Sequence, residues 1–140
     1  MRRYETSVDI AASPERVWSV MSDVTSMPTW TESMTSVELE PAGALAVGSR
    51  ALVRQPKLSP ATWVVTEVTA VRSYAWQTTV MGSVVTAFHS LTPTSGGSSV
   101  TLAVEYDGPT SALVAGMTRR VTTKYLRKEA AGLKLASERA

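Results

Sequence analysis

The sequence predicts an α+β fold in which one long C-terminal helix closes over an antiparallel sheet. The chain contains 18 Val and 18 Thr but only one Ile and one Phe, and so many β-branched residues favour strands. Segments that alternate apolar and polar residues follow one another at short intervals, which indicates a meander. The stretch from Thr110 to Arg139 contains no proline and reads as one helix. The predicted order is one strand, two short helices, about six strands and a long helix.

The first strand is predicted in "RYETSVDI", where alternation leaves one face buried. In the following "SPERVWSVM", Ser13 is a good N-cap, Pro14 suits the first helical position and Glu15 complements the helix dipole. Residues before a proline avoid the helical region, so this helix cannot extend cleanly to Pro28. We expect a second short helix or turn that carries Trp30.

The later strands are predicted in six segments that close turns separate: "MTSVELE", "RALVRQ", "ATWVVTEVTAVR", "SYAWQTTV", "SVVTAFHSLT" and "VTLAVEY". The turn "TSGGSS" precedes the last of them. The C-terminal helix is expected to bend at Gly116. A helix that crosses a twisted sheet changes the face that it buries along its length. The apolar face predicted for this helix changes in that way: it consists first of Leu113, Met117, Val121 and Tyr125, and then of Leu126, Ala130, Leu133 and Ser137.

Length and composition limit the class of protein. A chain of 140 residues with 44% hydrophobic residues can bury a core, and we expect one domain over residues 1–140. The absence of cysteine excludes disulfides and thiolate sites. The N-terminus lacks the apolar stretch of a signal peptide, and no apolar run approaches the ~20 residues of a membrane span. We therefore expect a cytoplasmic protein without integral membrane association.

Positive charge is concentrated in the C-terminal helix. The stretch from Leu113 to Ala140 contains seven basic and two acidic residues, so its net charge is +5 and that of the rest of the chain is −3. The favoured interpretation is a solvated helix face, and the alternative is a basic surface for an anionic partner. No nucleic-acid motif accompanies the charge, so we expect no nucleic-acid partner.

The sequence contains no recognisable catalytic constellation. His89 is the one histidine, and without cysteines or clustered carboxylates we expect no metal site and no cofactor. The glycine-containing turns lack a phosphate-loop ending, and no nucleophile elbow is present. His89 shares its strand face with Val85 and Leu91. It is interpreted as structural or solvated, or alternatively as a cavity residue and a weak catalytic candidate able to act as acid or base.

Three charged residues lie inside predicted strands. Glu105 is expected on the outer face, opposite an apolar set. Glu67 shares its side with Trp63, although a bulge would turn it outward. Arg54 is favoured on the convex face over the cavity.

Several motifs in order resemble the START/Bet v 1-like superfamily, in its bacterial polyketide cyclase/dehydrase-like branch. The motifs that resemble this superfamily are "SPERVW" after the first strand, then "PTW", "TWVVTEV", "YAWQT", "HSLTPTSGGSSVTL" and the C-terminal "YLRKEAAGLK". The resemblance covers essentially the whole chain. It implies the helix-grip fold, a curved antiparallel sheet wrapped around the C-terminal helix, with an apolar cavity between them and two short helices plugging one end.

The resemblance implies binding of a hydrophobic or aromatic small molecule, lipid-like or polyketide-like, in that cavity. Aromatic residues at such positions give an apolar wall with polar edges, whereas in a closed core they would simply pack. The expected ligand-binding residues are Trp30, Leu52, Trp63, Trp76, Phe88, Met117, Val121 and Tyr125.

Two other functions stay open. In the first alternative, the protein is a polyketide cyclase, aromatase or dehydratase that works mainly by holding a flexible chain in a reactive shape. Alternatively it is a protein-interaction module that uses a sheet edge or the basic helix. The sequence leaves ligand identity and the choice between monomer and homodimer undetermined.

Overall fold

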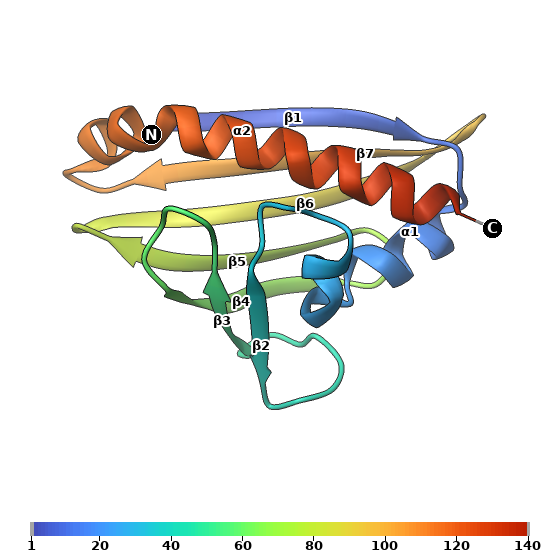
Figure 1. The fold of residues 1–140 in the computed structure, drawn as a ribbon, viewed down its shortest axis with the longest axis horizontal. Coiled ribbons are helices and arrows are strands. Elements are labelled where there is room, and N and C mark those ends of the chain that lie inside the picture. Colours follow the sequence, from blue (N-terminus) through green and yellow to red (C-terminus); the bar gives the residue numbers. More distant parts are fainter. Residues whose placement is uncertain (1, 140) are drawn as a thin grey trace.

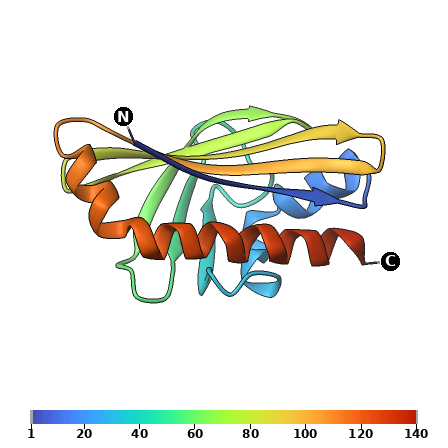
Figure 2. The ribbon, with the colours of Figure 1, turned by 90° about the horizontal axis from the view of Figure 1, so that it is seen from above.

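Seven antiparallel strands form one curved sheet, and a long helix lies across its concave face (Figures 1 and 2). The computed structural model describes residues 2–139. This arrangement is the predicted helix-grip fold. Its elements in chain order are β1 (Arg2–Ile10), α1 (Pro14–Met21), η1 (Val24–Thr29), β2 (Ser36–Glu40), β3 (Arg50–Arg54), β4 (Ala61–Thr69), β5 (Ser73–Val80), β6 (Ser83–Thr94), β7 (Gly97–Asp107) and α2 (Ser111–Glu138).

The strand order is β1-β7-β6-β5-β4-β3-β2, so the first strand of the chain pairs with the last one. The other neighbours are consecutive hairpins, as the short spacing of the strand segments predicts. One bulge interrupts the pairing of β4 with β5 between Val65 and Glu67. A bulge re-aims the side chain beside it, and Glu67 is exposed, where it accepts a hydrogen bond from the Ser73 hydroxyl at 3.0 Å.

Two short helical elements close one end of the sheet (Figure 1). The Ser13 side chain caps α1 by accepting a hydrogen bond from the backbone N–H of Arg16 at 3.2 Å, as its sequence position predicts. The second element, η1, is a 3-10 helix that contains Pro28 and ends at Thr29, with Trp30 as the residue that caps it. The apolar residues of both elements are buried in the core: Val17, Met21, Val24 and Met27.

The long helix α2 begins and ends within one residue of the predicted limits, but its first turns face differently from the prediction. Leu113 and Met117 are 56% and 64% exposed, whereas Val114 and Ala115 are buried. Figure 2 shows these first turns at an angle to the rest of the helix. The Thr118 hydroxyl donates to the Val114 carbonyl at 2.8 Å, a contact that bends helices, and Gly116 lies in the same stretch. In these first turns the buried positions are therefore Val114 and Ala115 instead of the predicted Leu113 and Met117.

The helix α2 approaches the backbone of Trp30 closely at Gly132. A Cβ atom added there would lie 1.9 Å from the backbone oxygen of Trp30. Glycine is therefore required by space, because any side chain would separate α2 from the chain that follows η1. Gly116 in the same helix has nothing within 4 Å of the same position.

Gly132→Ala is expected to lower the free energy of unfolding by roughly 2–4 kcal/mol, since the methyl group forces backbone to move in a packed interior. Gly116→Ala is the matched control and is expected to raise it by roughly 0.5–1 kcal/mol through helix propensity. Urea unfolding followed by circular dichroism measures both. Equal effects of the two substitutions would contradict the assignment of Gly132 as a close contact.

Candidate functional site: a cavity between sheet and helix

A cavity of about 740 Å³ lies between the concave face of the sheet and α2. This volume is within the range of small-molecule sites. The sheet contributes large side chains from β4 to β7, and the helix contributes the face that runs from Val114 to Glu129. The segment between β3 and β4, residues 55–60, forms a third wall. On α2 the cavity lining ends at Glu129, and Ala130 and Leu133 beyond it are buried in the core.

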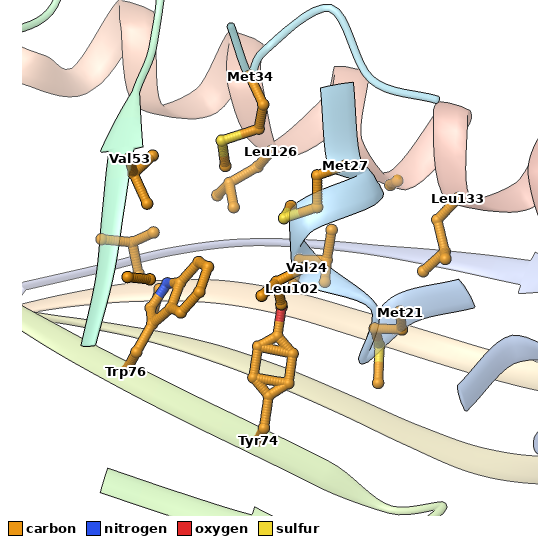
Figure 3. Packing of buried hydrophobic residues seen from close by; sticks show 14 of the residues in the cluster. Met21, Val24, Met27, Met34, Val53, Tyr74, Trp76, Leu102, Leu126 and Leu133 are labelled. Carbon is orange, nitrogen blue, oxygen red and sulfur yellow. The ribbon is translucent and has the colours of Figure 1, made fainter. Parts of the chain in front are cut away.

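The sheet wall is aromatic. Trp63 and Trp76 lie side by side with ring centroids 6.1 Å apart, and Trp76 meets the Tyr74 ring edge-to-face at 5.5 Å. Figure 3 shows Trp76 close to Val53 and Tyr74 close to the α1 and η1 side chains. Because the indole and phenol rings support one another, the wall is rigid and mainly apolar.

A group of hydroxyls forms a polar patch on the helix side. The Tyr106 hydroxyl lies 2.8 Å from the hydroxyls of both Thr118 and Thr122. All three residues line the cavity. Since these hydroxyls satisfy one another, the patch binds β7 to α2 without leaving a buried group unpaired.

The β3–β4 segment is attached to the helix and to the chain before β2. The Tyr125 hydroxyl donates to the Pro56 carbonyl, and the Gln55 side chain donates to the Ser33 carbonyl at 3.2 Å. Leu58, two residues after Pro56, is partly exposed and lines the cavity. These bonds hold the third wall in place.

His89 and Glu129 form a buried pair that borders the cavity. They are 4% and 7% exposed, and Nε2 of His89 lies 3.4 Å from Oε2 of Glu129. The other ring nitrogen, Nδ1, lies 3.3 Å from the Tyr74 carbonyl oxygen. The imidazole also stacks on the Tyr74 ring at 4.0 Å and meets Trp76 edge-to-face at 5.8 Å. Helix and sheet are thus joined by an ionisable pair within an aromatic environment.

Tyr74 lies behind this pair. Burial raises the pKa of its hydroxyl well above the ordinary value, and the nearby Glu129 carboxylate raises it further. Within residues 2–139 the hydroxyl has no hydrogen-bond partner. Figure 3 shows it directed into the apolar cluster that includes Val24 and Leu102. Tyr74 therefore supplies a neutral, rigid support for the imidazole.

The structure brings together four of the eight residues expected to bind ligand: Trp63, Trp76, Val121 and Tyr125 all line the cavity. Phe88 borders it as well, but strand alternation places its ring on the opposite face from His89, where the Arg3 guanidinium lies 5.8 Å from the ring centroid. The part of Phe88 that reaches the cavity is therefore backbone.

The other three expected residues lie elsewhere. Val53, not Leu52, points into the cavity, because successive residues of β3 alternate between the faces and the buried face carries Ala51 and Val53. Met117 is exposed for the reason given above. Trp30 packs its backbone against Gly132 instead of facing the cavity, and its indole N–H is buried without a partner in residues 2–139.

The sequence interpretation also missed Glu129. An acidic residue within the apolar set Leu126, Ala130 and Leu133 is a signal that could have found it, because helical spacing places all four on one side of α2. For His89 the less favoured alternative, a cavity position, is the one the structure shows. Glu105 lies on the outer face beside Arg3, as expected, and Arg54 is exposed.

Few other features of the described chain indicate chemistry. Residues 2–139 contain no cluster of three or more potential metal ligands among His, Asp and Glu. No helix in that range has the length and apolar character needed to cross a bilayer. On α2, Lys128 pairs with Glu32 and Lys134 with Glu138, whereas no ion pair within residues 2–139 involves the exposed Arg119, Arg120, Lys124 and Arg127. The basic helix is thus only partly neutralised.

Known proteins share this architecture. The family model described as "polyketide cyclase / dehydrase and lipid transport" matches residues 1–138. Among solved structures, the di-domain ARO/CYC StfQ from the steffimycin biosynthetic pathway is similar with a TM-score of 0.78 and 13% identity over 97% of this chain. This chain spans half the length of the StfQ chain.

Two other solved structures cover nearly the full length of both chains. TTHA0849 from Thermus thermophilus has a TM-score of 0.75 at 14% identity, with 97% of each chain covered. Ara h 8.0201 has a TM-score of 0.67 at 12% identity, with 94% of this chain and 97% of that chain covered. No curated protein sequence matches the chain. At these identities the likenesses show the fold.

Tyr74→Phe is expected to leave the free energy of unfolding unchanged, or to raise it by about 1 kcal/mol, because it removes a buried hydroxyl without a partner. The matched control, Tyr106→Phe, removes a hydroxyl that bonds Thr118 and Thr122 and is expected to cost about 1 kcal/mol. Chemical denaturation at neutral pH measures both. A larger loss for Tyr74→Phe than for Tyr106→Phe would contradict the unpaired state of the Tyr74 hydroxyl.

The same variant has a pH dependence. Because the folded-state pKa of Tyr74 lies above the unfolded-state value near 10.0, the unfolded chain loses this proton first as the pH rises. Ionisation of this hydroxyl therefore has no effect on the stability of the protein below pH 10.0 and lowers it above that value. Tyr74→Phe has no hydroxyl to ionise at this position, so it is expected to lose less stability than the parent protein on alkaline titration.

Proposed function

Because this chain belongs to the polyketide cyclase / dehydrase and lipid transport family, we propose that it binds one hydrophobic or aromatic small molecule in the cavity between sheet and helix. The observation that carries the proposal is the cavity itself, about 740 Å³ in volume and walled by Trp63, Trp76 and the apolar face of α2. A flat ring system placed against this wall exchanges water for aromatic contact, which is favourable without any charged anchor.

The arrangement of polar groups supports an amphipathic ligand. The hydroxyl patch of Tyr106, Thr118 and Thr122 and the pair of His89 and Glu129 lie on the cavity walls, while the surfaces between them are apolar. Such sites bury most of the ligand in apolar surroundings and fix its orientation with a few polar groups. Binding of a lipid-like or polyketide-like molecule is consistent with this distribution.

A second candidate function is an enzyme that cyclises or dehydrates a polyketide-like substrate. The observation that favours it is the position of His89, on the cavity side of the sheet with a carboxylate 3.4 Å away. An imidazole paired with a carboxylate can both give and take a proton during enolisation or loss of water. The ARO/CYC description of StfQ, which has the same fold, supports the same candidate.

Filling the cavity tests the binding function. Ala87→Phe places a phenyl ring on the cavity face of β6 and is expected to weaken binding of the fluorescent apolar dye N-phenyl-1-naphthylamine by at least ~10-fold, because the ring occupies the space of the ligand. Thr86→Phe on the other face of the same strand is the control and is expected to bind the dye as the parent protein does. Thermal melts check that both variants fold. A parent protein that takes up no dye would overturn the proposed function.

The enzyme is tested with a linear poly-β-keto thioester, whose conversion to an aromatic product is followed by absorbance. His89→Ala is expected to lower turnover by ~10²–10⁴-fold, the usual contribution of a general acid or base. The variant must still fold and take up the dye. Turnover that survives the substitution would remove His89 from the reaction, and the absence of turnover in the parent protein would leave binding as the function.

A further inference from the structure

We infer that His89 and Glu129 together form a binding site for a neutral hydroxyl group, so that the cavity selects phenols and alcohols over carboxylates and over hydrocarbons of the same shape. This inference rests on the proposed binding function and adds the chemical class of the ligand. It follows from the position of the pair on the cavity wall, from its open hydrogen-bonding capacity and from the presence of a carboxylate in it.

The contacts of the imidazole define its free side. A backbone carbonyl only accepts hydrogen bonds, so Nδ1 of His89, 3.3 Å from the Tyr74 oxygen, donates to it. Nε2 is the remaining ring nitrogen and lies 3.4 Å from Oε2 of Glu129. A proton on Nε2 makes this contact attractive and gives the pair a donor beside an acceptor.

The pair is also incompletely satisfied. Within residues 2–139, His89 is the one side chain that approaches the Glu129 carboxylate within ion-pair or hydrogen-bond distance. A carboxylate accepts about four hydrogen bonds, so most of its capacity is open, and the residue borders the cavity. Buried polar groups in native proteins normally find partners. A polar atom of the bound molecule is the partner that the cavity allows.

A hydroxyl fits this pair better than other groups. It donates to a Glu129 oxygen while its own oxygen accepts from the proton held by His89, and both contacts are made by one atom. A carboxylate has no proton to donate at neutral pH and would place a second negative charge beside Glu129. A hydrocarbon leaves the pair without a partner and gains nothing from it.

Apolar surroundings strengthen the selection. Tyr74 and Trp76 pack on two sides of the imidazole and keep water away from it. Hydrogen bonds that involve charged groups contribute roughly 1.5–3 kcal/mol, which corresponds to about a 10- to 150-fold preference. A mainly structural role for the pair, joining β6 to α2, would contribute to stability but would not distinguish among ligands.

The experiment measures displacement of N-phenyl-1-naphthylamine by three probes of one shape at neutral pH: 2-naphthol, naphthalene and 2-naphthoate. The parent protein is expected to bind 2-naphthol at least ~10-fold more tightly than naphthalene, with 2-naphthoate weakest. Glu129→Gln retains the side-chain shape and is expected to reduce the preference for the hydroxyl to within ~3-fold and to improve binding of the carboxylate. Glu67→Gln, the same change at an exposed carboxylate, is expected to leave both ratios unchanged.

Each outcome separates the two proposals. If the dye does not bind the parent protein, the proposed function itself fails. If the dye binds but 2-naphthol has no advantage, or keeps its advantage in Glu129→Gln, only the hydroxyl site is overturned. Should Glu129→Gln not fold, His89→Gln is expected to show the same loss of selectivity. Lower melting temperatures with unchanged ratios would assign the pair a structural role only.

Discussion

The close approach of α2 to the backbone of Trp30 lies at the packed end of the interior, beyond the cavity. Gly132 allows this approach, and the residues around it, Leu133 and Ala136, are buried in the core with the short helical elements. A helix of 28 residues is roughly 42 Å long. The sheet curves away beneath its other half, so the side chains from Val114 to Glu129 leave a cavity. One contact between a glycine and a carbonyl thus supports both the packed end and the open end.

The polar groups inside this frame cannot be explained by packing alone. An ionisable pair in the interior loses hydration that its mutual attraction only partly replaces, and apolar residues of similar size often give equal or greater stability. The Tyr74 hydroxyl, unpaired within residues 2–139, is a further cost. Departures of this kind from packing rules concentrate at functional sites in natural proteins. Of these departures, the pair of His89 and Glu129 is the one that borders the cavity.

The sequence was sufficient for the order of elements and insufficient for part of the cavity wall. Strand alternation and the Ser13 cap depend on neighbouring residues, so they are visible locally. The face of a short strand such as β3 depends on pairing, and Leu52 and Val53 are equally apolar; the choice between them is made by the register with β4. Likewise, Met117 is exposed because the first turns of α2 are bent, and no local sequence pattern specifies the angle of that bend.

The pair of His89 and Glu129 shows a different limit. The two residues are 40 positions apart, in a strand and in a helix, and only the docking of α2 across the sheet places them in contact. A lone histidine carries no spacing signal, and a single glutamate on an otherwise apolar helix side is easily taken for a surface residue. Of the aromatic residues, Trp63 and Trp76 were predictable through the resemblance to the START/Bet v 1-like superfamily, in which aromatic residues in the middle of strands line the cavity.

The pairing of β1 with β7 has a consequence for the order of folding. Arg2 lies opposite Tyr106, so this contact closes a loop of about one hundred residues, whereas the hairpins from β2 to β7 join neighbours in the chain. Closing long loops before they are stabilised by other contacts slows folding. During synthesis on the ribosome, β1 cannot pair with β7 until β7 has been synthesised. The helix α2 packs on both strands and is synthesised after them. The cavity between sheet and helix is therefore completed only when α2 has been synthesised, and a nascent chain that lacks this helix has no wall on that side of the cavity.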